Sequence, residues 1–341
     1  MSLPLIIAAL LASAAVVGFA GVRLARDGDA IAARTRLGGL WVGSVFVAVA
    51  TSLPELMSDV SAVLLGAPDL GVGGLFGSNI SNMLTLAIVS LVPGRDVFRR
   101  AAIDNALAAS LAITLTASAA ICVLLQPRES VLGVGVGPLL LALGYVAGVR
   151  TLFRNSELAR TAARVEEMGD EAKTVRAGTA PETDHQELRR AIRGFVLAAA
   201  VILVAAPLFA ASANALAEAT GLAKSFVGTW LVAIATTLPE LVTSLAAVRI
   251  RAYDLAVGNL FGSNAFNMSL FLALDLAAPG SIFAAVSPVH ALSGLIAMVL
   301  MGIGLAAIVY RAAGRLAALE PSAALMMVLY AVGIWLVYLQ S

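Results

Sequence analysis

Residues 43–83 read GSVFVAVATSLPELMSDVSAVLLGAPDLGVGGLFGSNISNM, and residues 228–268 read GTWLVAIATTLPELVTSLAAVRIRAYDLAVGNLFGSNAFNM. The two stretches align without a gap at an offset of 185 residues, the separation of Gly43 and Gly228. They share an Ala-Thr pair, the run Leu-Pro-Glu-Leu and the run Gly-Ser-Asn at corresponding positions. Agreement of this length at one offset indicates duplication, so the chain consists of two copies of one unit.

The chain is far more apolar than an ordinary soluble domain of its length. Of its 341 residues, 60% are hydrophobic and 13% are charged, and the mean hydropathy is +0.95. The amino-terminal run lacks a positively charged start and is too long for most signal peptides, so we interpret it as a first membrane helix that is not cleaved. Segments long enough to cross ~30 Å of hydrocarbon as helices lie at about 3–22, 38–65, 70–92, 101–125, 131–153, 192–217, 225–248, 254–276, 283–310 and 321–340. The predicted fold class is an all-α integral membrane protein with ten transmembrane helices.

A polar stretch at 154–190 carries charges of both signs and divides the ten predicted spans five and five. We predict a first five-helix repeat at 1–153, a connector at 154–190 and a second five-helix repeat at 191–341. An odd number of spans separates corresponding positions, so the second copy enters the membrane inverted. Inverted repeats with interrupted helices are the arrangement by which secondary transporters build a binding site at the middle of the membrane.

The basic residues predict the orientation, because cytoplasmic loops are enriched in Lys and Arg. With the amino terminus outside, only Arg128 and Lys224 fall on the outer side. We therefore expect a multi-pass protein of the plasma or inner membrane with its amino terminus outside and the 154–190 connector in the cytoplasm. The basic groups on the cytoplasmic side are this connector, Arg23, Arg26, Arg34, Arg36, Arg95, Arg99, Arg100, Arg249, Arg251, Arg311 and Arg315.

Each repeat places a proline and a glutamate inside an apolar span. Pro54 has no backbone N–H, so the carbonyl of Ala50 loses its helical partner and the helix opens there; Pro239 has the same effect in the second copy. Irregular backbone in a membrane is tolerated only where protein covers it or where it lines a wet cavity. We therefore expect freed carbonyl oxygens beside Glu55 and Glu240, and intramembrane carboxylates are usually functional.

Neutral oxygen groups accompany both glutamates. Thr51 and Ser52 lie four and three residues before Glu55, on the same helix face. Ser78 and Asn82 share a face of the third span, as Ser263 and Asn267 share a face of the eighth.

The resulting set consists of carboxylate, carbonyl, hydroxyl and amide oxygens, without His or Cys. Such a set selects hard cations, namely Na⁺, Ca²⁺, Mg²⁺ or Mn²⁺, over zinc or copper. Two glutamates carry a charge of −2, which one Ca²⁺ or two Na⁺ neutralise. Competition between unlike ions for one site is the basis of exchange.

The motifs ATSLPEL with GSNISN and ATTLPEL with GSNAFN resemble the two alpha repeats of the sodium/calcium exchanger family, within the cation/calcium antiporters. The resemblance implies a prokaryotic-type antiporter with electrogenic exchange of several Na⁺ for one Ca²⁺. It also implies alternating access by sliding of the first and sixth helices past the other eight. The implied ion ligands are Glu55 and Glu240, with assistance from Ala48, Thr51, Ser52, Ala233, Thr236, Thr237, Ser78, Asn82, Ser263 and Asn267.

Several positions depart from the family pattern. The residue before the Thr, often Gly in the family, is Ala50 in the first repeat and Ala235 in the second, which leaves the backbone less free to open. Asp59 stands where a hydroxyl is usual, as in Ser244 of the second repeat, and lies one turn from Glu55. Gly74 stands where the second repeat has Asn259. Asn at position 267, where the potassium-dependent branch carries Asp, argues against K⁺ co-transport.

Four further polar residues in the repeats receive structural interpretations. Asp69 and Asp254 precede the next span, which predicts helix N-caps. Asn79 and Asn264 predict hydrogen bonds between helices.

Several alternatives remain open from the sequence. The same glutamates serve a Ca²⁺/H⁺ antiporter, or one for another divalent cation, in which protons replace Na⁺. An intramembrane hydrolase would need an acid/base pair or a zinc motif such as HExxH, and neither is present, so we predict no enzyme activity and no catalytic residue. We expect Ca²⁺ and Na⁺, with H⁺ as an alternative, to bind transiently as substrates, the lipid bilayer to surround the protein, and neither cofactor nor nucleic acid to bind. The lone Cys122 rules out an intramolecular disulfide, and the oligomeric state is open.

Overall fold

The computed structural model describes residues 2–34, 49, 51–92, 97–101, 104–170, 185–310 and 320–340. Within these ranges the chain is nearly all helical. A short antiparallel hairpin of β1 (Ser130–Val131) and β2 (Val134–Gly135) joins two of the helices. The helices are α1 (Leu3–Arg34), α3 (Leu53–Leu64), α4 (Pro68–Ser90), α5 (Val97–Arg100), α6 (Asp104–Leu125), α7 (Val136–Asp170), α8 (His185–Thr220), α9 (Lys224–Val227), the π-helix η1 (Gly228–Val232), α10 (Ala233–Thr236), α11 (Leu238–Arg249), α12 (Tyr253–Ser269), α13 (Phe271–Ala277), α14 (Ile282–Ala285), α15 (His290–Tyr310) and α16 (Pro321–Gln340).

The described helices follow the predicted spans in order. Eight helical segments are long and apolar enough to cross a membrane, and the pair Lys224–Thr236 and Leu238–Arg249, bent by 44°, makes a ninth crossing. The predicted span 38–65 lies partly outside the described residues, which include its carboxyl-terminal part as α3.

Three predicted spans have wrong boundaries. The first, predicted to end at 22, continues to Gly28 within the helix Leu3–Arg34. The span predicted to start at 131 starts at Val136, because Leu132 (φ 53°) and Gly133 (φ 82°) form the tight turn of the β1–β2 hairpin. Positive φ at both central residues is the requirement of a type I′ hairpin turn. The span predicted at 283–310 is divided into α14 and α15, and Pro288 disfavours helical backbone at the residue before it.

Helices α7 and α8 extend into the stretch predicted as a connector. Helix α7 continues to Asp170, and α8 already begins at His185. Residues 171–184 lie outside the described residues. The 154–190 connector therefore stays a prediction in its central part, while both of its ends are helical.

The two repeats form the same helix hairpin. After α3, the N–H groups of Gly66 and Ala67 donate to the carbonyls of Val63 and Ala62 at 2.9 Å each, which is the Schellman arrangement. The turn after α11 repeats both bonds, with Arg251 (φ 66°) at the position of Gly66 (φ 75°). Left-handed backbone is costly for a residue with a Cβ atom, so its retention at Arg251 indicates that the turn geometry is required.

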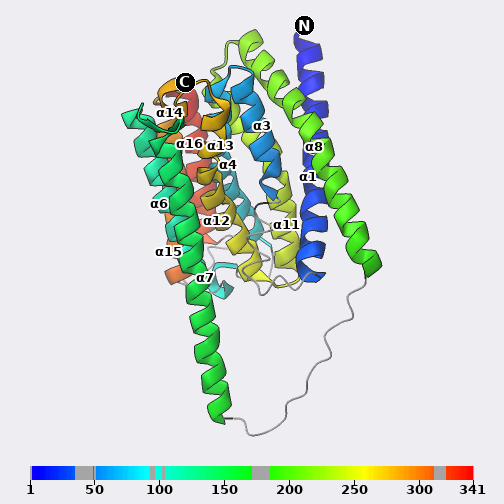
Figure 1. Cartoon of the computed structure of the whole chain (residues 1–341), viewed down its shortest axis with the longest axis vertical. Helices are drawn as coiled ribbons and strands as arrows, with labels where there is room; N and C mark the ends of the chain where they lie inside the picture. Colours follow the sequence, from blue (N-terminus) through cyan, green and yellow to red (C-terminus); the bar gives the residue numbers. More distant parts are fainter. Residues whose placement is uncertain are drawn as a thin grey trace.

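The two hairpins point in opposite directions. In Figure 1 the turn between α3 and α4 lies near the end of the molecule where α1 begins and α16 ends, whereas the turn between α11 and α12 lies near the opposite end. The second copy is therefore inverted relative to the first, as predicted.

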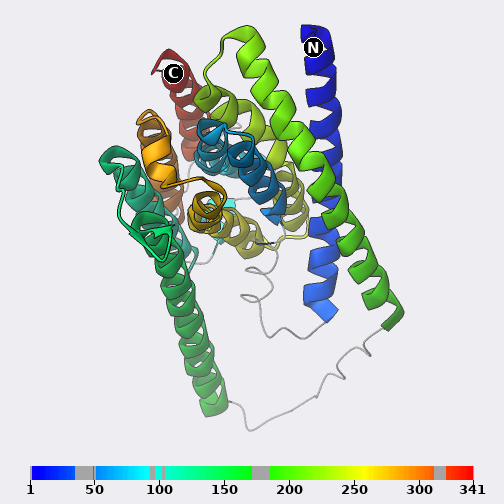
Figure 2. The ribbon, with the colours of Figure 1, turned by 45° about the horizontal axis from the view of Figure 1, so that its top comes forward.

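The helices fall into two packed groups. Helices α1 and α8 lie side by side along one flank, while α4 and α12 occupy the centre with α3 and α11 next to them (Figures 1 and 2). One apolar cluster is centred on α4, α6, α12 and α15, and contains Phe76, Phe261 and Phe271. A second cluster joins α1 and α8 to each other and to residues of α3, α4, α9 and η1, and much of its α8 side is alanine.

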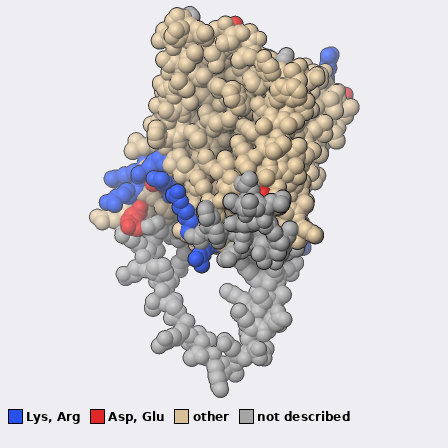
Figure 3. Space-filling view, turned by 180° about the vertical axis from the view of Figure 1, so that it is seen from behind, with Lys and Arg blue, Asp and Glu red and all other residues tan. Residues whose placement is uncertain are grey.

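The outer surface is apolar over a broad band. Phe19, Leu125 and Trp335 are 79%, 74% and 58% exposed, although such side chains are normally buried in water-soluble proteins. On the face shown in Figure 3, charged side chains of the described residues gather toward the two ends and leave the middle to other residue types. This distribution fits a chain surrounded by lipid.

Candidate ion-binding site

Both repeats interrupt their helices at equivalent residues. Ser52 (φ −85°, ψ 8°) precedes α3, and Thr237 (φ −83°, ψ 6°) precedes α11, so the two breaks have nearly the same backbone conformation. A proline follows within two residues of each break and lies in the first turn of the new helix. Helix breaks beside both prolines are confirmed at Ser52 and Thr237, whereas Ala50, whose carbonyl was predicted to lose its partner, lies outside the described residues. In the second repeat the π-helix η1 lies one turn before the break.

The glutamates occupy the first turns of α3 and α11. The positive end of a helix dipole favours a carboxylate there. Glu55 is 1% exposed and Glu240 is fully buried. Among the described residues, neither oxygen of Glu55 has a hydrogen-bond partner, and Oε2 of Glu240 has none.

Residues of the first repeat surround the glutamate of the second. The hydroxyl of Ser52 donates to Oε1 of Glu240 at 3.5 Å. Thr51 and Ser263 also lie beside this carboxylate, and Glu55 is near enough to Glu240 for their charges to interact. The structure therefore brings both predicted glutamates and several predicted hydroxyls to one place.

Four asparagines join α4 to α12 around the repeat axis. Asn79 Nδ2 donates to the carbonyl of Asn264 at 3.2 Å, and Asn264 Nδ2 donates to the carbonyl of Asn79 at 3.3 Å. Asn82 Nδ2 donates to Oδ1 of Asn264 at 2.9 Å, and Asn267 Nδ2 donates to Oδ1 of Asn79 at 3.1 Å. These two pairs of bonds exchange under the 185-residue offset, so the predicted interhelical role of Asn79 and Asn264 is confirmed.

This network orients the amides of Asn82 and Asn267. Their Nδ2 groups are used between the helices, and their Oδ1 atoms are buried without a hydrogen-bond partner in the described structure. A buried acceptor that lacks a donor is costly. Two amide oxygens are thereby available for a cation, as are the hydroxyls of Ser78 and Ser263, which are fully buried.

Of the remaining predicted ligands, three form hydrogen bonds within their own helix and one lies outside the described residues. Thr236 donates its hydroxyl to the carbonyl of Val232 at 3.1 Å, and Thr237 donates its hydroxyl to the carbonyl of Ala233 at 2.9 Å. The backbone N–H of Thr237 also donates to Ala233, so both lone pairs of that carbonyl are occupied. Ala48 lies outside the described residues.

The site therefore contains two buried carboxylates and neutral oxygens. Among the residues that the structure describes, no three His, Cys, Asp or Glu side chains converge closely enough to hold one metal ion. Carboxylate, hydroxyl and amide oxygens are the ligands that hard cations accept. Because unpaired buried carboxylates are costly, this arrangement fits cation binding better than structural packing.

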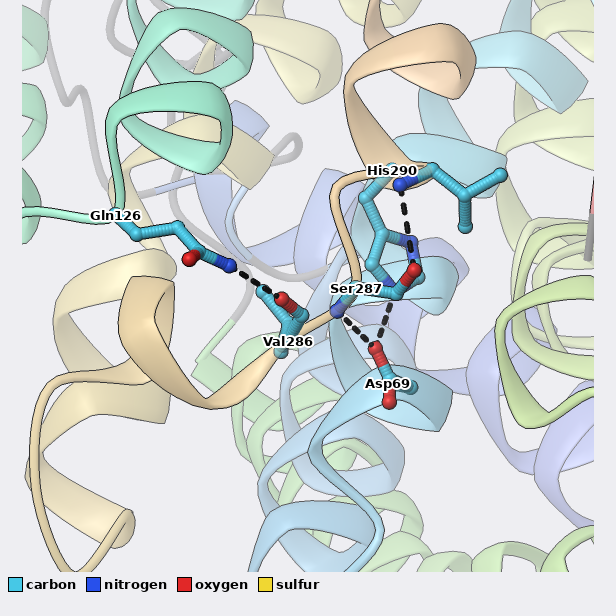
Figure 4. A network of polar contacts seen from close by, with 6 residues as sticks. Asp69, Gln126, Val286, Ser287 and His290 are labelled. Carbon is cyan, nitrogen blue, oxygen red and sulfur yellow. Dashed lines mark hydrogen bonds and ion pairs between the residues drawn. The ribbon is translucent and has the colours of Figure 1, made fainter.

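The predicted N-cap roles of Asp69 and Asp254 are wrong. Helices α4 and α12 are preceded by Ala67 and Ala252, and neither helix has a side-chain cap. Asp69 instead accepts from the backbone N–H of Ser287 at 2.7 Å, and its Oδ1 lies 3.0 Å from Nε2 of His290 (Figure 4). The carboxylate connects α4 to the start of α15, because it bonds to Ser287 and His290 there and not to the N–H groups at the start of α4.

Asp254 makes the equivalent contact in the other repeat. Its Oδ1 accepts from Nδ2 of Asn105 at 3.1 Å. The 185-residue offset relates Asp69 to Asp254 and Asn105 to His290, so these are one contact in two chemical versions. We did not predict it, although aligning the repeats beyond residue 83 would have paired Asn105 with His290.

Comparison with known proteins gives a consistent result. The family model described as "Sodium/calcium exchanger protein" matches residues 5–151 and 190–339. The inner membrane protein YrbG of Escherichia coli is 31% identical over 249 residues, which are 71% of this chain and 71% of that protein.

Two solved structures have the same fold. The sodium-calcium exchanger NCX_Mj matches with a TM-score of 0.60 and 19% identity over 98% of this chain and 99% of that one. The H⁺/Ca²⁺ exchanger CAX matches with a TM-score of 0.69 and 14% identity over 98% of this chain and 85% of that one. The predicted fold class, an all-α integral membrane protein of ten transmembrane helices in two inverted five-helix repeats, is confirmed.

Proposed function

Because this chain belongs to the sodium/calcium exchanger protein family, we propose that it is a secondary active antiporter that exchanges Na⁺ for Ca²⁺ by alternating access. The observation that carries the proposal is the meeting of Glu55 and Glu240, both buried, from two inverted helices that break at equivalent residues. Their combined charge of −2 is neutralised by one Ca²⁺ or by two Na⁺, so the ions compete.

The proposed ligands divide into two groups. The first group consists of residues that are all at most 1% exposed, including Glu55 and Glu240, and within it the hydroxyl of Ser52 donates to Glu240. Thr236, Thr237 and the carbonyl of Ala233 form the second group, whose present hydrogen bonds within the helix must rearrange for the carbonyl to coordinate. The first group comprises Glu55, Glu240, Thr51, Ser52, Ser78, Ser263, Asn82 and Asn267, and Ala48 is retained from the family resemblance.

The proposed movement is a sliding of α1 and α8 past the other helices. In support, α1 and α8 belong to a different apolar cluster from the one centred on α4, α6, α12 and α15, and they meet α3, α4, α9 and η1 within it. Gly21 of α1 lies against the rings of both Pro54 and Pro239, at the two breaks. A helix that touches both breaks can cover one route to the glutamates while the other is open.

We propose that the protein lies in the plasma or inner membrane. Its orientation is the one predicted from the basic residues, with the amino terminus outside and the 154–190 connector in the cytoplasm. The turn between α3 and α4 then faces outward, and the turn between α11 and α12 faces the cytoplasm.

Flux into proteoliposomes tests the proposal. We expect an imposed outward Na⁺ gradient to drive uptake of ⁴⁵Ca²⁺, and we expect Glu240→Gln to abolish it, because a neutral amide cannot balance the ion. Asn214→Gln, at a position away from the glutamates, serves as the control. A rate of Ca²⁺ uptake that is the same with and without the Na⁺ gradient would contradict Na⁺ coupling.

The second candidate is a Ca²⁺/H⁺ antiporter, or one for another divalent cation, that uses the same site. The observation that favours it is that both oxygens of Glu55 and Oε2 of Glu240 are buried and have no donor among the described residues, since such an oxygen can bind a proton in place of a cation. A pH gradient imposed on the same vesicles separates the two candidates: uptake driven by pH alone would replace the first proposal with the second.

A further inference from the structure

Asp59 is a third buried carboxylate near the proposed site. It lies on α3 four residues after Glu55, and therefore on the same helix face one turn away. Its side chain is 1% exposed, and Oδ2 has no hydrogen-bond partner among the described residues. Neither a cap nor an ion pair between described residues accounts for this charge.

The neighbouring helix is shaped to admit this carboxylate. A Cβ atom added to Gly74 of α4 would collide with Oδ1 and Cγ of Asp59. The carboxylate therefore occupies the space of the side chain that position 74 lacks. In the second repeat the equivalent residues are Ser244 and Asn259, and both are fully buried. The second repeat therefore has a buried hydroxyl and a buried amide at the positions where the first has a carboxylate packed against a glycine.

The carboxylate continues the line of oxygens that begins at the glutamates. Gly74 precedes Ser78 by four residues on α4, so Asp59 packs one turn from the Ser78 hydroxyl, which also lacks a partner in the described structure. The direction is from Glu55 toward the turn between α3 and α4. Since three acidic side chains do not converge on one point within the described residues, Asp59 is separate from the pair of glutamates.

We propose that Asp59 forms a further cation-binding position, one helical turn from Glu55 toward the α3–α4 turn, that takes a hard cation, Na⁺ or Ca²⁺. The inference rests on the proposed antiport function. It assigns to cation binding a third carboxylate besides those of Glu55 and Glu240. A cation there compensates a carboxylate that the protein otherwise buries at a cost. A cation that enters from the α3–α4 turn would bind at Asp59 first and then move one helical turn to Glu55 and Glu240.

Titration of purified full-length protein with Na⁺ and with Ca²⁺ tests this position. Asp59→Asn keeps the shape and removes the charge, and we expect it to weaken binding of the cation that uses the position at least tenfold. The double variant Asp59→Ser with Gly74→Asn installs the pair found in the second repeat. We expect it to fold, as the second repeat does, and to show the same loss. The ion whose affinity falls identifies the occupant.

Two further variants make the result specific. Gly74→Ala displaces the carboxylate without altering it, so we expect weaker cation binding. Ser58→Ala removes a neighbouring buried hydroxyl on α3 and should leave binding within twofold. Thermal unfolding of each variant confirms that it is folded.

The outcomes separate this inference from the proposed function. If Asp59→Asn and the double variant bind both ions like the wild type while Glu240→Gln binds neither, the Asp59 position is overturned and the antiporter survives. If Glu240→Gln also binds like the wild type, the proposed function itself fails.

Discussion

At the scale of single residues, the orientation of four amides prepares the candidate site. Asn79 and Asn264 each use their side chain across the repeat axis, and they hold the amide nitrogens of Asn82 and Asn267. An amide has distinct donor and acceptor ends, so fixing the nitrogen between helices directs the oxygen elsewhere. The residues that bind helices together thereby determine what their neighbours offer to an ion.

Substitution of the central asparagines tests this arrangement. Asn79→Ala removes bonds to Thr116 and to the carbonyl of Asn264, as well as the acceptor for Asn267. We expect a loss of about 1–3 kcal/mol in stability for each buried group left without a partner, together with weaker Ca²⁺ binding. Thermal unfolding in detergent and calcium titration measure the two effects.

The repeat supplies the comparison for this prediction. Asn264→Ala removes the bond to the carbonyl of Asn79 and the acceptor for Asn82, but no counterpart of the Thr116 bond, so it should cost somewhat less than Asn79→Ala. Asn214→Ala, which loses an exposed bond to Glu218, should cost less than about 0.5 kcal/mol. Central variants no less stable than Asn214→Ala would contradict the role assigned to the network.

At the scale of elements, the same kind of helix contact occurs in both repeats with a different donor residue in each. The first turn of α4 contacts the start of α15 through Asp69 and His290, and the first turn of α12 contacts the start of α6 through Asp254 and Asn105. Duplication accounts for the shared geometry. The divergence of one donor from amide to imidazole shows that the contact requires a donor and not a particular side chain.

Exchange of that donor tests the equivalence. His290→Asn installs the residue of the other repeat, which donates to Asp254 at 3.1 Å in its own place. We expect stability within about 1 kcal/mol of the wild type, because a donor to Asp69 remains. His290→Leu leaves the carboxylate short of a donor and should cost about 1–3 kcal/mol.

Thermal unfolding of the two His290 variants, alongside Asn105→Leu as the counterpart, measures the difference. Equal stability of His290→Asn and His290→Leu would show that the contact contributes nothing beyond packing.

At the scale of the whole molecule, two apolar clusters meet at the proline breaks. The α1–α8 cluster contains many small side chains, such as Ala206, Ala210 and Ala213 on α8, and a surface of small side chains allows close approach. Because the cluster also includes residues of α3, α4, α9 and η1, movement of the pair would slide it along these neighbours. Gly21 of α1 lies against Pro54 and Pro239, so movement of α1 would change its contacts at both breaks.

Two glycines on α1 provide a matched test of this movement. A Cβ atom at Gly21 would lie 2.5 Å from Cγ of Pro239 and 3.1 Å from Cγ of Pro54, and proline rings cannot turn aside. A Cβ atom at Gly18 would meet the terminal methyl of Leu238 at 2.8 Å, which can rotate away. We expect Gly21→Ala to slow sodium-driven Ca²⁺ flux at least tenfold and Gly18→Ala to slow it less than threefold.

Equilibrium Ca²⁺ binding should change little in either glycine variant, because α1 contributes no proposed ligand. Equal flux in the two variants would argue against a special role for the contact between α1 and the breaks.

Much of the fold could be predicted because its causes are local in the sequence. The apolar runs, the prolines at 54 and 239 and the repeat at one offset act within a few residues, and the helices follow them. The boundaries that were wrong have two kinds of cause. The late start of α7 follows from the local turn at Leu132 and Gly133, whereas the division of the later span involves a contact between distant segments. The break between α14 and α15 accompanies a bond from Ser287 to Asp69, which is 218 residues away in the chain.

The sequence alone determined the inverted repeat, the two glutamates and the all-oxygen character of the candidate site, because residue type and spacing carry that information. Only the tertiary structure decided which oxygens are uncommitted. The amide oxygens of Asn82 and Asn267 have no donor within the described part of the chain, because residues of the opposite repeat hold their nitrogens. It also decided that Asp59 fills the space beside Gly74. Hydrogen-bond partners and packing volume arise between helices, and no single helix specifies them.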